Sequence, residues 1–236
     1  MWQVPDRVEM GRHTRLGDTL SVLTGLDNYC RLHRNGRKME VCTPLGPQLA
    51  ELFGFPNLVC LEQAAGGESL DGQFGACSWR EDWPSRFYNK LCRDSGLTPL
   101  QVRMPDSKLG AWRGGSAVYA QLDTRSGSPL TAAEMKRFVA LASMRRRITV
   151  LGGPDTGKYL GDCYEYSLGN VGHLARMLLE CHHMIGVDSG VAHLAGYLGA
   201  PACITNCCGF EAVYAFFGEY KGFRFIDRSF LTQEIK

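Results

Sequence analysis

The chain has 236 residues, of which 44% are hydrophobic, 21% charged and 10% aromatic. This composition is typical of a globular protein and excludes wholesale disorder, a collagen-like chain and a coiled coil. Its 26 basic residues nearly balance 24 acidic ones, and the net charge of +2 provides no strong field for gripping nucleic acid or an anionic membrane. The sequence shows neither an apolar run of membrane-spanning length nor a signal-peptide pattern, which predicts a cytoplasmic protein.

Cysteine and glycine are the two residue types whose numbers call for an explanation. The ten cysteines are scattered along a chain that is long enough to fold without disulfides, so we expect mostly free thiols. The two densest groups, Cys181-His182-His183 and Cys203 with Cys207-Cys208, lack the spacing of zinc ligands, and no metal site is predicted. The 28 glycines exceed the average share and indicate tight turns and close approach of the backbone to a ligand.

The first half of the chain alternates strand and helix patterns. Residues 4–10 predict a short strand, and Asp18 is placed to cap a helix that Gly36 ends. Further elements follow in the order strand, helix, strand, at residues 39–42, 46–53 and 57–61. The pattern then weakens from residue 64 to 115, apart from a predicted helix over 84–93. This order is typical of a parallel sheet, and the weak stretch places a domain boundary at residue 115.

The second half repeats the same alternation. Helix periodicity and short apolar runs predict strands at 117–122, 148–151, 184–187 and 202–205, and helices at 131–144, 170–181 and 190–198. We therefore expect two α/β domains, residues 1–115 and 116–222. The aromatic-rich end, residues 223–236, is expected to form a tail that returns to the first domain.

The segment from His183 to Pro201 holds the densest group of candidate functional residues. A buried strand leads directly into Asp188-Ser189-Gly190 at the start of a helix, where backbone amides and the helix dipole favour an anion such as a diphosphate. His193 follows one turn later on the same face, where its ring could add a hydrogen bond or a charge. The alternative is purely structural: Asp188 caps the helix and His193 is a satisfied interior histidine.

Two segments resemble a known family. G-V-D-S-G-V-A-H-L-A-G-Y-L-G-A-P, residues 186–201, resembles the D-[ST]-G-x-x-H-[LI]-A-x-x-x-G-x-P motif of glycosyltransferase family 9, the ADP-heptose:lipopolysaccharide heptosyltransferases. Arg15-Leu-Gly-Asp-Thr-Leu20 is similar to that family's G-D-[VT]-[LV] motif. The resemblance implies a GT-B-like α/β fold, in which two Rossmann-like parallel-sheet domains face a cleft. The nucleotide-sugar is then held mainly by the second domain, and the acceptor approaches from the first.

The resemblance also implies roles for individual residues. Asp18 matches the general base that takes the proton of the acceptor hydroxyl, although a plain helix cap is the structural alternative. Arg15 and Gly17 lie on the acceptor side. The donor-binding motif corresponds to Asp188, Ser189, Gly190 and His193. The implied activity is an inverting, metal-independent sugar transfer that needs no cofactor besides the nucleotide-diphosphate sugar, and no Asp-x-Asp metal motif occurs in the chain.

Further donor contacts and the acceptor are less well defined by the sequence. Arg125 and the pair Gly152-Gly153 are candidates for the donor phosphate and nucleoside. The chain is shorter than typical family members between residues 64 and 115, so the acceptor does not carry over. The basic clusters at 31–38 and 145–147 are either solvated helix ends or part of a groove that binds an acidic acceptor. Such an acceptor would be an anionic or hydroxylated glycan of the lipopolysaccharide type or a modified nucleic-acid base, with peripheral membrane contact a further expectation.

The sequence also allows two alternatives to sugar transfer. Gly152-G-P-D-T-G-Lys158 fits the phosphate-binding P-loop pattern after a strand, but Tyr159 replaces the Ser or Thr that would hold Mg²⁺. The other rival is a nucleotide- or sugar-binding protein on the same fold that lacks transfer activity.

Overall fold

The computed structural model describes residues 4–10, 15–62, 68–70, 85–123, 128–152, 162–164, 170–209, 211, 213 and 217–232. The chain divides into two compact units, Met1–Leu109 and Gly110–Lys236. This division lies close to the boundary that the loss of regular pattern predicts at residue 115.

The first unit is built on a four-stranded sheet with the strand order β3-β2-β1-β4. Every pair in it is parallel, and the strands are β1 (Arg7–Glu9), β2 (Met39–Cys42), β3 (Leu58–Leu61) and β4 (Glu68–Ser69). Its helices are α1 (Leu16–His33), α2 (Gly46–Leu52) and α4 (Ser85–Asp94). The predicted strand-helix-strand-helix-strand order is confirmed for residues 7–61. Short connections and buried apolar strands favour this parallel arrangement.

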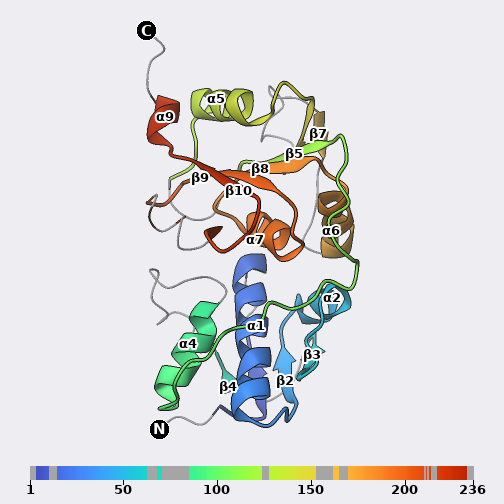
Figure 1. The fold of residues 1–236 in the computed structure, drawn as a ribbon, viewed down its shortest axis with the longest axis vertical. Helices are drawn as coiled ribbons and strands as arrows, with labels where there is room; N and C mark the ends of the chain where they lie inside the picture. Colours follow the sequence, from blue (N-terminus) through green and yellow to red (C-terminus); the bar gives the residue numbers. More distant parts are fainter. Residues whose placement is uncertain are drawn as a thin grey trace. The chain divides into compact units, whose positions relative to one another are not determined.

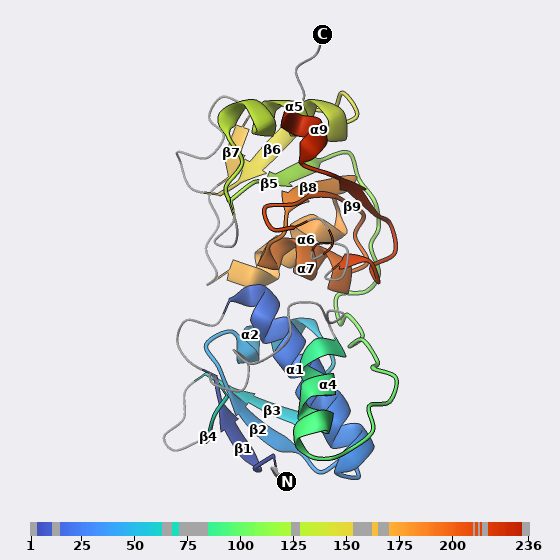
Figure 2. The same ribbon diagram turned by 90° about the vertical axis from the view of Figure 1, so that its left-hand side faces the viewer.

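Helices α1 and α4 lie side by side in the first unit (Figures 1 and 2). Gly25 makes this possible, since a Cβ added there would meet the backbone nitrogen of Tyr88 at 2.9 Å. Side chains further along the two helices add hydrogen bonds: Tyr29 Oη reaches Ser95 Oγ at 3.3 Å, and the His33 ring reaches Tyr88 Oη at 2.9 Å. The close packing fixes the position of α4 against the second half of α1.

The second unit is built on a six-stranded, wholly parallel sheet with the order β10-β9-β8-β5-β6-β7. The strands are β5 (Val118–Gln121), β6 (Ile148–Leu151), β7 (Asp162–Tyr164), β8 (His183–Val187), β9 (Ala202–Thr205) and β10 (Phe223–Ile226). Helices α5 (Ala132–Ala142) and α9 (Ser229–Thr232) lie on one face, and α6 (Val171–Leu179) and α7 (Gly190–Tyr197) lie on the other (Figures 1 and 2).

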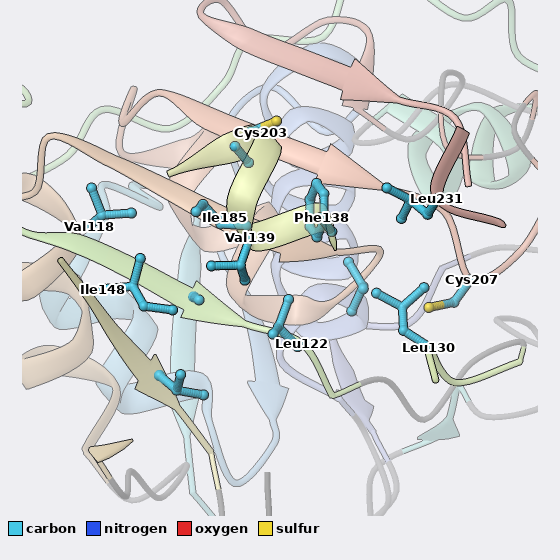
Figure 3. Packing of buried hydrophobic residues seen from close by; sticks show 14 residues of the cluster. Val118, Leu122, Leu130, Phe138, Val139, Ile148, Ile185, Cys203, Cys207 and Leu231 are labelled. Atoms are coloured by element: carbon cyan, nitrogen blue, oxygen red, sulfur yellow. The ribbon is translucent and has the colours of Figure 1, made fainter. Parts of the chain in front are cut away.

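The core of the second unit forms where α5 packs on the sheet. Phe138 and Val139 of α5 lie beside Ile185 of the central strand β8 in a buried cluster that also draws on β5, β6 and β9 (Figure 3). Helix α5 begins with a complete capping box, because Thr131 accepts from the Glu134 backbone N–H while Glu134 accepts from the Thr131 backbone N–H. All five residues of β8 are buried, as expected for the centre of a sheet covered on both faces.

The end of the described chain differs from the sequence-based expectation. Residues 223–226 form strand β10, which pairs in parallel with β9, and α9 then contacts α5. Residues 223–232 are therefore part of the second unit's sheet and its cover, and they do not form a tail that returns to the first domain. The sequence Phe-Arg-Phe-Ile has too short an alternation to stand out, and its pairing with β9 depends on a partner some twenty residues earlier.

Candidate functional site

The start of α1 places Asp18 in the first helical turn. The helix begins at Leu16 with Arg15 as N-cap, so Asp18 is the third helical residue and not the N-cap that the sequence predicts. Its carboxylate instead accepts a hydrogen bond from the Arg15 backbone N–H, which is one half of a capping box. Gly17 is buried in the same turn, while Arg15 is exposed.

The electrostatic surroundings of Asp18 suit a base. Burial raises the pKa of the Asp18 carboxyl above its ordinary value, and the positive charges of Arg15 and Arg86 together with the Arg15 N–H offset part of that rise. A carboxylate whose pKa is raised is a stronger base, so it accepts a proton more readily. The side chain is only half-buried, so a substrate hydroxyl can approach it.

Arg86 is a member of this site that the sequence did not reveal. It lies in the first turn of α4, is 1% exposed and is among the largest fully buried side chains of the chain. Full burial of arginine is rare and requires compensating polar partners, and the nearby Asp18 carboxylate contributes to that compensation. From the sequence, an arginine near the start of a short helix is expected to be solvated. Its burial beside Asp18 becomes evident only from the packing of α4 on α1.

In the second unit, Ser189 lies between the end of β8 and the start of α7. Ser189 is the N-cap, with φ −145° and ψ 164°, and its Oγ accepts from the Ala192 backbone N–H at 3.3 Å. The first-turn amides of Gly190 and Val191 precede any intrahelical acceptor, as at every helix start. Ser189 and Gly190 are partly exposed, so this turn is accessible at the carboxyl end of a central parallel strand.

Asp188 ties this turn to the neighbouring loop. One carboxylate oxygen accepts from the Cys207 N–H at 3.0 Å and the other from the Cys208 N–H at 3.1 Å. Asp188 therefore fixes the loop after β9 against the start of α7, and the capping role considered for it belongs to Ser189.

His193 lies in an aromatic cluster on the inner side of α7. Its ring stacks on Phe217 with centroids 4.3 Å apart, and Nδ1 lies 3.2 Å from Tyr220 Oη. Burial lowers the pKa of His193 to about 3, so the ring is neutral at physiological pH. The structure thus matches the interior-histidine alternative, and a positive charge from His193 on a phosphate is not available near neutral pH.

Gly196 allows the Tyr220 ring to lie directly on α7. A Cβ at this position would lie 2.4 Å from the Tyr220 ring, closer than real contacts allow. Tyr220 and Phe217 belong to the segment before β10, so this packing joins α7 to that part of the unit. This packing fixes the end of α7 against the segment that carries Tyr220.

The cysteines that the structure describes are free thiols. Burial raises the pKa of Cys181 and Cys207 to about 12, which keeps both protonated and weakly reactive. In the described part of the chain, no three His, Cys, Asp or Glu side chains gather closely enough to hold a metal ion. Among the same residues, no helix combines the length and the apolar character needed to cross a membrane.

Solved glycosyltransferase structures share this architecture. A glycosyl transferase family 9 protein from Veillonella parvula matches with a TM-score of 0.62 and 12% identity, over 95% of this chain and 86% of that one. E. coli ADP-heptose lps heptosyltransferase II matches with a TM-score of 0.59 and 11% identity, over 96% and 94% of the two chains. The fold is that of the heptosyltransferases. The iron-containing dodecameric glycosyltransferase TibC of enterotoxigenic E. coli gives 0.59 and 14%, over 86% of this chain and 59% of its own.

No protein-family model and no curated protein matches the chain. The structural matches confirm the predicted GT-B-like α/β class with two Rossmann-like parallel-sheet domains. The cleft between the domains stays a prediction.

The structure gathers some of the predicted site residues and leaves others outside its described part. Asp188, Ser189, Gly190 and His193 come together around the end of β8 and the start of α7. Gly152 follows β6, which ends at the same edge of this parallel sheet, two strands away from β8. The remaining donor-side candidates, Arg125, Gly153 and the P-loop lysine Lys158, lie outside the described residues.

Proposed function

We propose that this protein transfers a sugar from a nucleotide-diphosphate sugar to a hydroxyl acceptor, with inversion at the anomeric carbon. The observation that carries the proposal is the start of α7, a serine-capped, glycine-led helix that follows the central strand of a parallel sheet. Such a turn is a ready anion site, and on this fold it coincides with the motif that resembles the donor-binding segment of family 9.

In the proposed donor site, the backbone N–H groups of Gly190 and Val191 bind the diphosphate. The absence of a side chain at Gly190 lets phosphate oxygens approach the backbone, and the positive end of the helix dipole stabilises their charge. Asp188 and His193 act as positioning residues, because their hydrogen bonds hold the neighbouring loop and the aromatic cluster against α7.

Asp18 is the proposed base. The acceptor oxygen attacks the anomeric carbon while its proton passes to the Asp18 carboxylate. The bond from that carbon to the diphosphate oxygen breaks, and the electron pair leaves with the nucleoside diphosphate. The amides at the start of α7 stabilise the charge that develops on this leaving group, which is the task that a metal ion performs in other transferases.

We propose that the transfer needs no metal, because the amides at the start of α7 stabilise the leaving group. Since TibC is iron-containing, metal independence needs a direct test. Turnover that survives a chelator supports the proposal, and turnover that requires an added divalent ion contradicts it. For the acceptor we propose a glycan hydroxyl.

The donor site can be tested with proline. Gly190→Pro removes the first amide of α7, and proline fits this position because the preceding Ser189 has the extended conformation that proline favours. Ala132→Pro is the matched control, since Ala132 is the exposed first residue of α5 and follows Thr131 at φ −70° and ψ 162°.

Thermal shift is the readout, with ADP and other nucleoside diphosphates as ligands and ADP-heptose as the first nucleotide-sugar. A ligand at 100 times its Kd stabilises the folded protein by roughly 2.7 kcal/mol. We expect this stabilisation in the wild type and in Ala132→Pro, and its loss in Gly190→Pro. An equal shift in Gly190→Pro, or no shift with any of these ligands in the wild type, contradicts the proposed site.

A further inference from the structure

The second unit contains an open pocket that the proposed donor site does not use. Its volume is about 610 Å³, within the range of small-molecule sites. It lies between the end of α5 and the beginning of strands β8, β9 and β10, whereas Asp188 and Ser189 follow the opposite end of β8. None of the proposed donor residues lines it.

One wall of the pocket is apolar and exposed. Leu141 is 55% exposed, Met144 52% and Trp112 38%, although all three are large hydrophobic side chains. The indole of Trp112 is held in place, because its Nε1–H donates to the Cys181 carbonyl at 2.8 Å. Exposed large hydrophobic side chains gathered around one pocket are typical of a binding site.

The turn that carries Met144 has an unfavourable backbone conformation. Met144 and Arg145 both have positive φ, 53° and 61°, in the left-handed region that residues with a Cβ avoid. Met144 lines the pocket, and the basic residues 145–147 come directly after it in the sequence. Strained backbone of this kind tends to persist where function requires it.

The polar part of the pocket is basic. Arg224 lines it and is exposed, and His182 and His183 line it beside the start of β8. Among the described residues that form its walls, none is acidic. Burial lowers the pKa of His183, and the positive charges of Arg146 and Arg224 lower it further, which indicates a positive potential at this end of the pocket.

Hydrogen bonds define the state of the two histidine rings. His183 Nε2 lies 2.8 Å from the Ala142 carbonyl, which can only accept, so Nε2 carries the proton of the neutral ring. His183 Nδ1 is then an acceptor, and His182 Nδ1 donates to it at 2.8 Å. The remaining nitrogen of the neutral His182 ring, Nε2, is then an acceptor, and it can take a hydrogen bond from an O–H group of a ligand in the pocket.

We propose that this pocket binds an amphiphilic anion, with an alkyl chain against Leu141, Met144 and Trp112 and a phosphate or carboxylate head beside Arg224. The apolar wall and the basic end match the two parts of such a ligand, and the absence of acidic groups from the described walls removes any repulsion of the head. This site is independent of the proposed sugar transfer.

Two substitutions test the two halves of the site without disturbing the fold. Met144→Gly removes an apolar wall, and glycine accepts the positive φ better than methionine does. Arg224→Gln removes the exposed cation. Leu100→Gln serves as control, because Leu100 is 53% exposed but belongs to the first unit.

Calorimetric titration of the full chain with decyl phosphate below its micelle concentration gives the readout. We expect saturable one-to-one binding that each pocket variant weakens by about tenfold or more, equivalent to losing one charged hydrogen bond or one buried apolar group. Leu100→Gln should bind as the wild type does, and decyl glucoside and inorganic phosphate should bind far more weakly than decyl phosphate.

Three results would overturn the proposal. The first is that monomeric decyl phosphate shows no saturable binding. The second is that both pocket variants bind it with the affinity of the wild type. The third is that the wild type binds inorganic phosphate as tightly as decyl phosphate. A parallel titration with phosphatidylglycerol vesicles distinguishes a membrane source of the same chemistry. Binding to vesicles without binding to the monomer also contradicts the pocket.

Discussion

At the scale of a single residue, the raised pKa of Asp18 has opposite effects on its basicity and on the stability of the fold. Burial that raises the pKa of its carboxyl makes it a better base and also makes the ionised form less stable in the folded protein. A carboxyl pKa raised above the unfolded value contributes stability only at low pH, and that contribution is lost as pH rises through the folded pKa. Once ionised, Asp18 therefore lowers the stability of the folded protein in exchange for reactivity.

Asp18→Asn should reveal this opposition. We expect a melting temperature at pH 7 equal to or above that of the wild type, with an advantage that disappears as pH falls below the ordinary aspartate range. The affinity for a nucleoside diphosphate should not change, since the proposed donor residues lie elsewhere in the chain. Thermal melts across pH with and without ADP measure both, and a variant that is less stable at pH 7 contradicts the assigned cause of the pKa shift.

Gly196 tests the packing that positions α7. Gly196→Ala places a methyl group where the Tyr220 ring lies, 2.4 Å away, so we expect a loss of about 1–3 kcal/mol in the free energy of unfolding. Gly172→Ala is the control, because nothing lies within 4 Å of that position in α6 and alanine should stabilise the helix by up to about 1 kcal/mol. Urea denaturation distinguishes the two, and equal effects would show that the Tyr220 ring moves aside freely.

At the scale of elements, one ion pair joins α5 to the segment before α9. Arg228 Nε donates to Glu134 at 2.7 Å, and its Nη2 donates to the other carboxylate oxygen at 2.9 Å. The same guanidinium donates to the Ser128 and Pro129 carbonyls, so both ends of the pair are saturated. Hydrogen bonds from Arg228 hold the pKa of Glu134 at about 2, well below its ordinary value of 4.5.

The lowered pKa predicts a pH-dependent stability. The ion pair contributes fully above pH 4.5 and is lost as pH falls towards 2, because protonation of Glu134 releases the arginine. Glu134→Gln should therefore destabilise the protein by about 1.5–3 kcal/mol at pH 7, the range expected for losing a hydrogen bond between charged groups. Denaturation at pH 7 and pH 3 measures this, and the difference from the wild type should shrink at pH 3. The exposed Glu51→Gln should show little effect at either pH.

Elements with a regular pattern could be predicted from the sequence, and those that depend on distant partners could not. Strands 39–42 and 202–205 agree with the predicted ranges, because each is a short apolar run with a turn residue nearby. Strand β10 escaped prediction, since its alternation is short and its pairing with β9 is non-local. The sequence pattern predicts the start of α1 three residues too late, because acidic residues are common both at the N-cap and at the third helical position.

The candidate site shows the same division. Ser189 and Gly190 could be predicted from the strand-to-helix motif, since the chemistry of an anion site is local. The burial of Arg86 and the aromatic surroundings of His193 could not, because each depends on segments tens of residues away in the sequence.

At the scale of the whole molecule, the chain has two parallel-sheet units, and each carries one half of the proposed chemistry at a strand-to-helix turn. The base belongs to Met1–Leu109 and the donor-binding turn to Gly110–Lys236. This division predicts that the two functions can be lost separately: Gly190→Pro should abolish donor binding, whereas Asp18→Asn should abolish turnover alone. A binding protein without transfer activity would show the first loss but have no turnover to lose.

The most direct test is therefore the release of nucleoside diphosphate from a nucleotide-sugar, with ADP-heptose first, by the wild type and by Asp18→Asn at saturating donor. We predict that the wild type turns over the donor, by transfer to a glycan or by slow hydrolysis. Asp18→Asn should bind the donor equally well and turn over roughly 10²–10⁴ times more slowly, the usual contribution of a general base. Undiminished turnover in Asp18→Asn would contradict the assigned mechanism, and donor binding without any turnover in the wild type would contradict the transferase itself.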